Sequence, residues 1–116
     1  MSKIKVSYNL ISDDQNIKYE GFGIKKNNRI IIKEKNLIFV LEANDKTISL
    51  NRKSNEYELC LFLNEDNSNG YLINEIGKIN LEIKLLEYKY ENNIINISYL
   101  LNDQKFTLKL NYEVVE

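Results

Sequence analysis

The sequence predicts an all-β fold, an antiparallel, up-and-down β-barrel of about 8–10 strands. Three observations support this prediction. Segments that alternate between apolar and polar residues recur along the whole chain at a spacing of roughly ten residues. Short polar pairs rich in asparagine separate many of these segments and are typical of tight hairpin turns. No segment shows the apolar period of an amphipathic helix.

The composition limits the class of protein. A chain of 116 residues fits one domain, 1–116, and 43% hydrophobic with 28% charged residues is typical of a globular protein. The net charge is −1 and the lysines are dispersed, so we expect no nucleic-acid partner. No apolar run is long enough for a membrane span, so we expect no membrane partner either. The single Cys60 and the lack of an apolar signal region predict a cytoplasmic location.

Catalysis has little support in the sequence. The chain contains no histidine, which is the usual general base near neutral pH and the commonest metal ligand. A Ser-His-Asp triad therefore cannot form, and Cys60 alone cannot hold zinc. We expect no enzymatic activity, no catalytic residues, no metal site and no cofactor.

The N-terminal part of the chain predicts three strands, Lys3–Ile11, Ile17–Lys26 and Arg29–Glu34. In the second of these, the apolar residues change parity at Gly21, within Gly21-Phe22-Gly23. Glycine at such a switch favours a bulge or a sharp bend at a barrel corner. The alternative is that two missing side chains leave room for a ligand.

The central part predicts three more strands, Asn36–Ala43, Lys46–Lys53 and Glu56–Leu63. Two-residue turns at Asn44-Asp45 and Ser54-Asn55 would connect them. These turns place Arg52 opposite Leu37 on one side and opposite Tyr57 on the other, with the large apolar residues of the paired positions on one face. Because a slip of one residue would turn a strand's apolar set outward, the pattern predicts the register of the hairpins.

The C-terminal part predicts a short strand, Tyr71–Ile76, a long strand, Lys78–Glu91, and two strands after the turns Asn92-Asn93 and Asn102-Asp103. In the long strand, the apolar parity shifts between Leu85 and Leu86, which predicts a β-bulge near residues 85–86. The two turns place Tyr99 opposite Leu86 and Phe106, so that the apolar faces of neighbouring strands agree.

Several stretches resemble the YwiB-like family of uncharacterised bacterial proteins. They are the opening KIKVSYNLISDD, the strand end Leu50-Asn51-Arg52, and the block from Gly70 to Gly77 that precedes an alternating strand. The resemblance spans essentially the whole chain and implies a calycin-type (lipocalin-like) β-barrel. It implies no activity, because the family has none assigned, and so it transfers no functional residue.

Arg52 is the main candidate for a binding residue. It shares its parity with the inward-facing Leu50, and it is one of only two arginines in the chain. An inward guanidinium near a barrel mouth can bind a carboxylate or phosphate, with a tyrosine hydroxyl assisting. The alternative is that Arg52 closes the barrel end, with its stem packed on Tyr57 and its head in water. The candidate ligand-binding residues are Arg52, Tyr57, Leu37, Tyr19 and Tyr99.

A second apolar face lies opposite the predicted core. Its residues are Ile38, Val40, Cys60 and Phe62. A contiguous exposed apolar face usually marks an interface, so these residues are candidates for a homodimer or protein contact unless the N-terminal strands cover them. Two functions therefore remain open: binding of a small apolar or acidic-headed ligand inside the barrel, or a filled barrel that contacts other proteins through this face.

Overall fold

The computed structural model describes all 116 residues, and every regular element is a β-strand. No element is a helix long and apolar enough to cross a membrane. The strands are β1 (Ser2–Ile11), β2 (Asn16–Lys26), β3 (Arg29–Glu34), β4 (Leu37–Ala43), β5 (Ile48–Ser54), β6 (Tyr57–Leu63), β7 (Asn69–Asn74), β8 (Gly77–Leu81), β9 (Ile83–Glu91), β10 (Ile94–Leu101) and β11 (Gln104–Val114). The count of eleven exceeds the predicted 8–10 strands.

The strands form one antiparallel sheet in the order β8-β7-β6-β5-β4-β3-β2-β1-β11-β10-β9. Strands that follow one another in the chain are paired, with a single exception at β8 and β9. The first and last strands, β1 and β11, pair along their lengths and join the two halves of the sheet. Across the remaining gap, β9 contacts β6 and β7. The prediction of an antiparallel, up-and-down β-barrel is confirmed, and the barrel is nearly closed.

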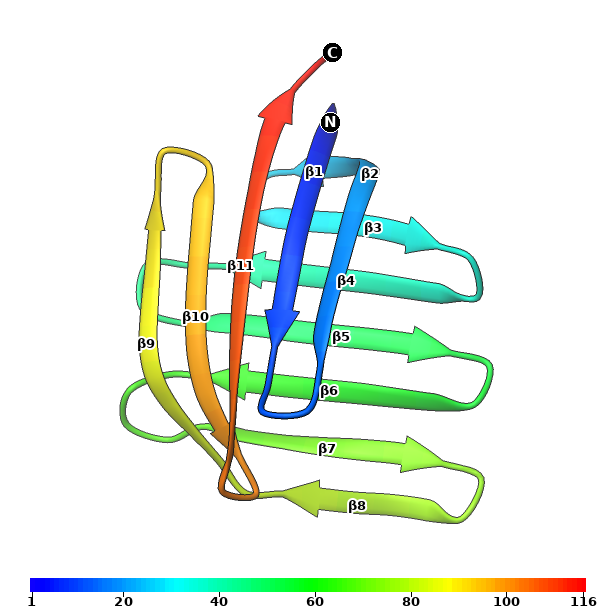
Figure 1. The fold of residues 1–116 in the computed structure, drawn as a ribbon, viewed down its shortest axis with the longest axis vertical. Helices are drawn as coiled ribbons and strands as arrows, with labels where there is room; N and C mark the ends of the chain where they lie inside the picture. Colours follow the sequence, from blue (N-terminus) through cyan, green and yellow to red (C-terminus); the bar gives the residue numbers. More distant parts are fainter.

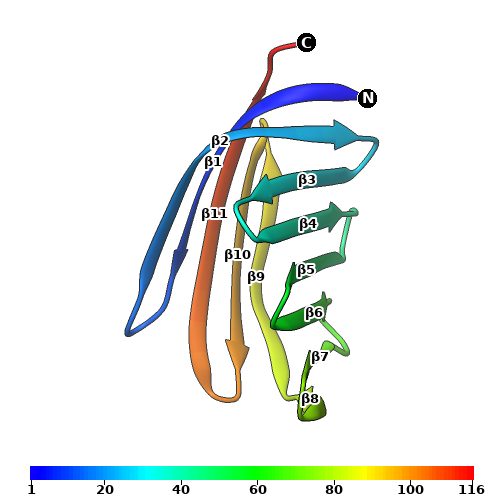
Figure 2. The same ribbon diagram turned by 90° about the vertical axis from the view of Figure 1, so that its right-hand side faces the viewer.

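The sheet folds over into two layers. Strands β3–β8 form one layer and run horizontally in Figure 1, whereas β1, β9, β10 and β11 run vertically in front of them. Figure 2 shows β2 curving over the top of the molecule from one layer to the other. Closing a strongly twisted sheet in this way covers the apolar face of each layer with that of the other.

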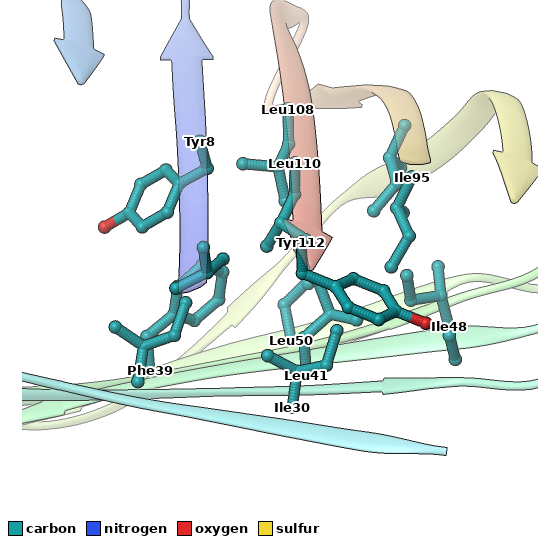
Figure 3. Packing of buried hydrophobic residues seen from close by; sticks show 14 of the residues in the cluster. Tyr8, Ile30, Phe39, Leu41, Ile48, Leu50, Ile95, Leu108, Leu110 and Tyr112 are labelled. Atoms are coloured by element: carbon teal, nitrogen blue, oxygen red, sulfur yellow. The ribbon is translucent and has the colours of Figure 1, made fainter. Parts of the chain in front are cut away.

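The core lies between the two layers. Figure 3 shows Tyr8, Leu110 and Ile95 of β1, β11 and β10 pointing toward Phe39 and Leu50 of β4 and β5. The cluster contains 18 buried residues from both layers, and none of the buried side chains is polar or charged. Burying a Leu, Ile or Phe side chain contributes about 1.5–3 kcal/mol, so this cluster is the main source of stability.

The central hairpins bury the predicted faces but use a different register. Asn44 to Thr47 form a four-residue connection, closed by the Asn44 amide donating to the Thr47 carbonyl at 2.8 Å. At the next turn, the Ser54 hydroxyl accepts from the amides of Glu56 and Tyr57 at 3.1 and 3.3 Å, which moves the turn one residue along. Each pairing therefore shifts by two residues, which preserves every side chain's face.

The shift changes the neighbours of Arg52. It lies opposite Phe39 on β4 and Leu59 on β6, and not opposite Leu37 and Tyr57 as predicted. Leu37 pairs with Ser54, and Tyr57 pairs with Asn74 of β7. The prediction of an Arg52–Tyr57 cross-strand pair was wrong because parity alone cannot distinguish registers that differ by two.

The glycines of β2 mark a bend without a bulge. Strand β2 pairs with β1 continuously from Asn16 to Lys25, so of the two predicted possibilities the bulge is absent. Gly21 and Gly23 keep the inward parity of Tyr19, whereas Phe22 points outward and is 55% exposed. A Cβ at Gly21 would clash with the Tyr19 ring, and one at Gly23 would lie 2.7 Å from the Ile31 carbonyl oxygen. The glycines therefore permit close packing where β2 turns between layers.

The predicted long strand Lys78–Glu91 is divided into β8 and β9 by a corner at Glu82. The β10–β11 turn stabilises this corner, since the Asn102 amide donates to the Glu82 carbonyl at 2.9 Å and the Glu82 amide donates to Asn102 Oδ1 at 3.1 Å. The predicted bulge near residues 85–86 is present: Tyr99 pairs with Leu85, and the register shifts between Ser98 and Tyr99. Leu86 is the extra residue, so the predicted Leu86–Tyr99 pair was wrong.

Candidate ligand-binding cavity

A small cavity of about 120 Å³ lies between the two layers. Its walls are mostly apolar, since 10 of its 12 lining residues are hydrophobic. Leu50 and Leu61 of one layer and Leu108 of the other line it and are almost fully buried. Gln15, in the exposed β1–β2 turn, lies at the outer end. The cavity is therefore an apolar hollow near the rim of the barrel.

Arg52 carries the single formal charge of the cavity lining. The side chain is partly buried, and its guanidinium lies over the Phe39 ring with the central carbon 6.0 Å from the ring centroid. The Nε atom is buried and has no hydrogen-bond partner, and it is the only such buried side-chain atom in the protein. Leaving a buried donor unpaired costs about 1–3 kcal/mol, more for charged groups. The unpaired donor lowers the free energy of unfolding, so stability does not explain its presence.

Tyr8 forms the wall beside Phe39. Its hydroxyl donates a hydrogen bond to Oε2 of Glu34 at 2.8 Å, and its ring packs edge-on against Phe39 with centroids 5.4 Å apart. Burial, followed by the hydrogen bond to Glu34, raises the pKa of Tyr8 well above its usual value of 10.0. Tyr8 therefore stays protonated, and its proton is committed to Glu34 outside the cavity lining.

Tyr99 lines the cavity from the opposite layer. The residue is 4% exposed, and its ring stacks on Phe106 with centroids 5.6 Å apart. Burial raises the pKa of Tyr99 to about 12, although the nearby positive charge of Arg52 opposes this effect. Its hydroxyl is therefore protonated at neutral pH. No protein group accepts a hydrogen bond from it, so the proton can be donated to a bound molecule.

The structure brings only some of the predicted binding residues together. Arg52 and Tyr99 both line the cavity. Tyr19 does not, but its ring stacks on Tyr8 with centroids 5.4 Å apart and so supports the cavity wall. Leu37 lies outside the lining, near the start of β4. Tyr57 lies in a separate, open groove between the β5–β6 and β7–β8 turns.

Sequence reasoning missed the role of Phe39 and Glu34. Glu34 shares its parity with the buried Ile30 and Ile32. An acidic residue at an inward position is unusual, and this pattern could have identified Glu34 from the sequence. Phe39 was expected in the core, but its contact with Arg52 depends on the register that the turns set. No sequence signal placed Gln15 at the cavity, because the conformation of the β1–β2 turn decides its position.

The predicted outer apolar face is not continuous. Ile38 and Phe62 are 42% and 46% exposed, but Cys60 is 5% exposed and Val40 is half-buried. Asn51 lies between Val40 and Cys60 in the cross-strand row, and its Nδ2 atom contacts Cys60 Sγ at 2.8 Å and donates to Glu58 at 2.9 Å. Polar groups therefore divide the surface between Ile38 and Phe62.

Comparison with known proteins identifies the fold. No protein-family model matches the chain, and no curated protein sequence matches it significantly. Among solved structures, the chain is similar to the crystal structure of the ywiB protein from Bacillus subtilis, with a TM-score of 0.68 at 11% sequence identity. The match covers 98% of this chain and 91% of that chain. At this identity the similarity establishes a shared fold and carries no information on ligands.

Proposed function

We propose that this protein is a non-enzymatic, cytoplasmic binding protein that holds a small, acidic-headed apolar molecule in the cavity beside Arg52. The observation that carries the proposal is the buried Arg52 Nε atom, which has no partner in an otherwise apolar cavity. Ligand sites are typically apolar hollows in which a few polar groups set orientation, and the mouths of β-barrels are common places for them. A carboxylate would satisfy the guanidinium by charge and by hydrogen bonding.

A native mass spectrum of the protein, purified gently from its own source, tests this function. We expect extra mass that is retained under native conditions and lost on denaturation, and its value would identify the ligand. The Arg52→Met variant prepared in parallel should lack this mass. The proposal is wrong if both proteins show only the mass of the chain without a ligand, and if the wild type binds no small acid or apolar probe in solution.

A second candidate is self-association through the outer face of β4 and β6. It is supported by the exposure of Ile38 and Phe62, which are 42% and 46% exposed. Cys60 is too buried to contribute contact area, so Ile38 and Phe62 would have to supply it. Light scattering across a concentration series tests this candidate. A dimer that dissociates in the Phe62→Lys variant would support it, and a monomer at all concentrations would remove it.

We also infer membership of the YwiB-like family and a calycin-type barrel. The sequence resemblance and the shared fold support this inference independently. An alignment of homologues with intermediate identity to both chains would test it. Retention of an arginine at the position of Arg52 across such sequences would also support the proposed site.

A further inference from the structure

The size, charge and lining of the cavity define the class of ligand more narrowly. We propose that the ligand is a short monocarboxylate whose apolar body has about four to five carbon atoms, with the carboxylate at Arg52 and Tyr99 and the body directed toward Leu50, Leu61 and Leu108. This inference rests on the proposed function, because it concerns the same cavity.

The charge of the lining indicates a monoanion. Arg52 carries one positive charge, and no acidic side chain lines the cavity. Glu34 lies outside the lining, where its carboxylate accepts a hydrogen bond from the Tyr8 hydroxyl. The single positive charge of Arg52 neutralises one negative charge on a bound ligand. A dianion such as phosphate would keep an uncompensated charge in an apolar space, which is strongly unfavourable.

The donors indicate a carboxylate. Arg52 Nε is buried without a partner, and the Tyr99 hydroxyl, from the opposite layer, makes no hydrogen bond to the protein. Two donors from facing layers suit a group with two acceptor oxygens. Such charge-assisted hydrogen bonds are shorter and stronger than neutral ones. The carboxylate would thus link the two layers at the barrel rim.

The position of the donors sets the orientation of the ligand. Arg52 is partly exposed, whereas Leu50, Leu61 and Leu108 are 6%, 1% and 1% exposed. Arg52 therefore lies nearer to solvent than the three leucines. A ligand with its carboxylate at Arg52 places its hydrocarbon body against the three leucines, where removal of apolar surface from water favours binding.

The volume limits the size of the body. The cavity has a volume of about 120 Å³. An apolar protein cavity of about 150 Å³ accommodates benzene, so this cavity accepts a slightly smaller group. Long-chain fatty acids exceed this space, and their tails would have to leave the barrel. The ligand class is therefore branched or short linear acids, and benzoate, whose ring alone is as large as benzene, lies just above the limit.

A calorimetric titration with linear carboxylates from acetate to decanoate, together with benzoate and inorganic phosphate, tests the inference. From acetate to pentanoate we expect the affinity to rise about fourfold for each added methylene, as burial of that group predicts. From hexanoate to decanoate we expect no further gain. Phosphate should not bind measurably in the same range.

Variants connect the binding to the donors. Pentanoate affinity should fall at least about tenfold in both Arg52→Met and Tyr99→Phe, as loss of a hydrogen bond to a charged carboxylate predicts. Arg29→Met is the matched control: Arg29 is bonded to Glu42 at 2.9 Å on the exposed outer face, and its removal should leave affinity unchanged. Circular dichroism of each variant verifies folding.

The outcomes separate the inference from the proposed function. Affinity that keeps rising through decanoate would overturn the size limit and leave an acid-binding barrel in place. Phosphate binding that exceeds pentanoate binding would overturn the ligand class. If no acid of any length bound the wild type, or if Arg52→Met bound pentanoate as well as Arg29→Met did, both the inference and the function at Arg52 would be wrong.

Discussion

Replacing Arg52 by methionine should stabilise the ligand-free protein. The substitution removes a guanidinium whose Nε atom is buried without a hydrogen-bond partner. Methionine has a similar linear stem and adapts to irregular apolar space, so it can occupy the same path beside Phe39 and Leu59. Residues that serve binding often reduce stability, because selection retains them for function.

The magnitude follows from two opposing contributions. Removing an unpaired buried donor recovers about 1–3 kcal/mol in the free energy of unfolding. Losing the cation–π contact with Phe39, at 6.0 Å from the ring centroid, costs about 0.5–1 kcal/mol. The free energy of unfolding should therefore rise by up to about 2.5 kcal/mol.

Urea denaturation followed by far-UV circular dichroism measures this change, with the denaturant slope unchanged from the wild type. Arg29→Met removes the same type of residue and the same charge, but from an exposed ion pair with Glu42 whose side chains are 55% and 36% exposed. That variant should lose only about 0.2–1 kcal/mol. If Arg52→Met instead destabilised the fold by more than about 1 kcal/mol, Arg52 would be a structural residue that closes the barrel rim.

Three further predictions test the fold itself. Leu110→Ala should lower the free energy of unfolding by about 2–5 kcal/mol because Leu110 is 0% exposed between the layers. Phe62→Ala, at a position that is 46% exposed, should lower it far less. Equal losses of the two variants in urea denaturation would contradict the two-layer core. Gly70→Ala should destabilise by about 1–3 kcal/mol because its Cβ would lie 2.6 Å from the Cys60 carbonyl oxygen, and a neutral effect would mean that β6 and β7 pack less closely. Alkaline pH should also destabilise the fold: the folded-state pKa of Tyr99 is raised from 10.0 to about 12, so its contribution is complete below pH 10 and is lost as the pH rises toward 12. Tyr99→Phe should reduce this loss, and a wild-type stability that is constant across this range would contradict the burial of the hydroxyl.

Much of the fold was predictable because burial imposes a period of two on every strand. The faces of β4, β5 and β6 and the hairpins at Asn92-Asn93 and Asn102-Asp103 follow from this period together with turn chemistry. Both residues of each of these turns have positive φ, which asparagine and aspartate tolerate better than most residues. The bulge at Leu86 was predictable from a change of parity within one strand.

The features that escaped prediction depend on contacts between distant segments. The corner at Glu82 exists because Asn102, twenty residues along the chain, satisfies its backbone groups. The register of β4, β5 and β6 depends on the Ser54 hydroxyl and on a four-residue connection after Ala43. For the same reason the sequence placed Arg52 on the inner face but paired it with Tyr57, whereas its neighbours are Phe39 and Leu59.

The most direct test of the proposed site is a nuclear magnetic resonance titration that observes the arginine Nε–H groups. The chain contains only two arginines, Arg29 and Arg52, so each Nε–H signal can be assigned with a single variant. On addition of pentanoate, we expect the Arg52 signal to shift to lower field and to become protected from exchange with water, while the Arg29 signal stays in place. A shift of neither signal, or equal shifts of both, would contradict a carboxylate site at Arg52.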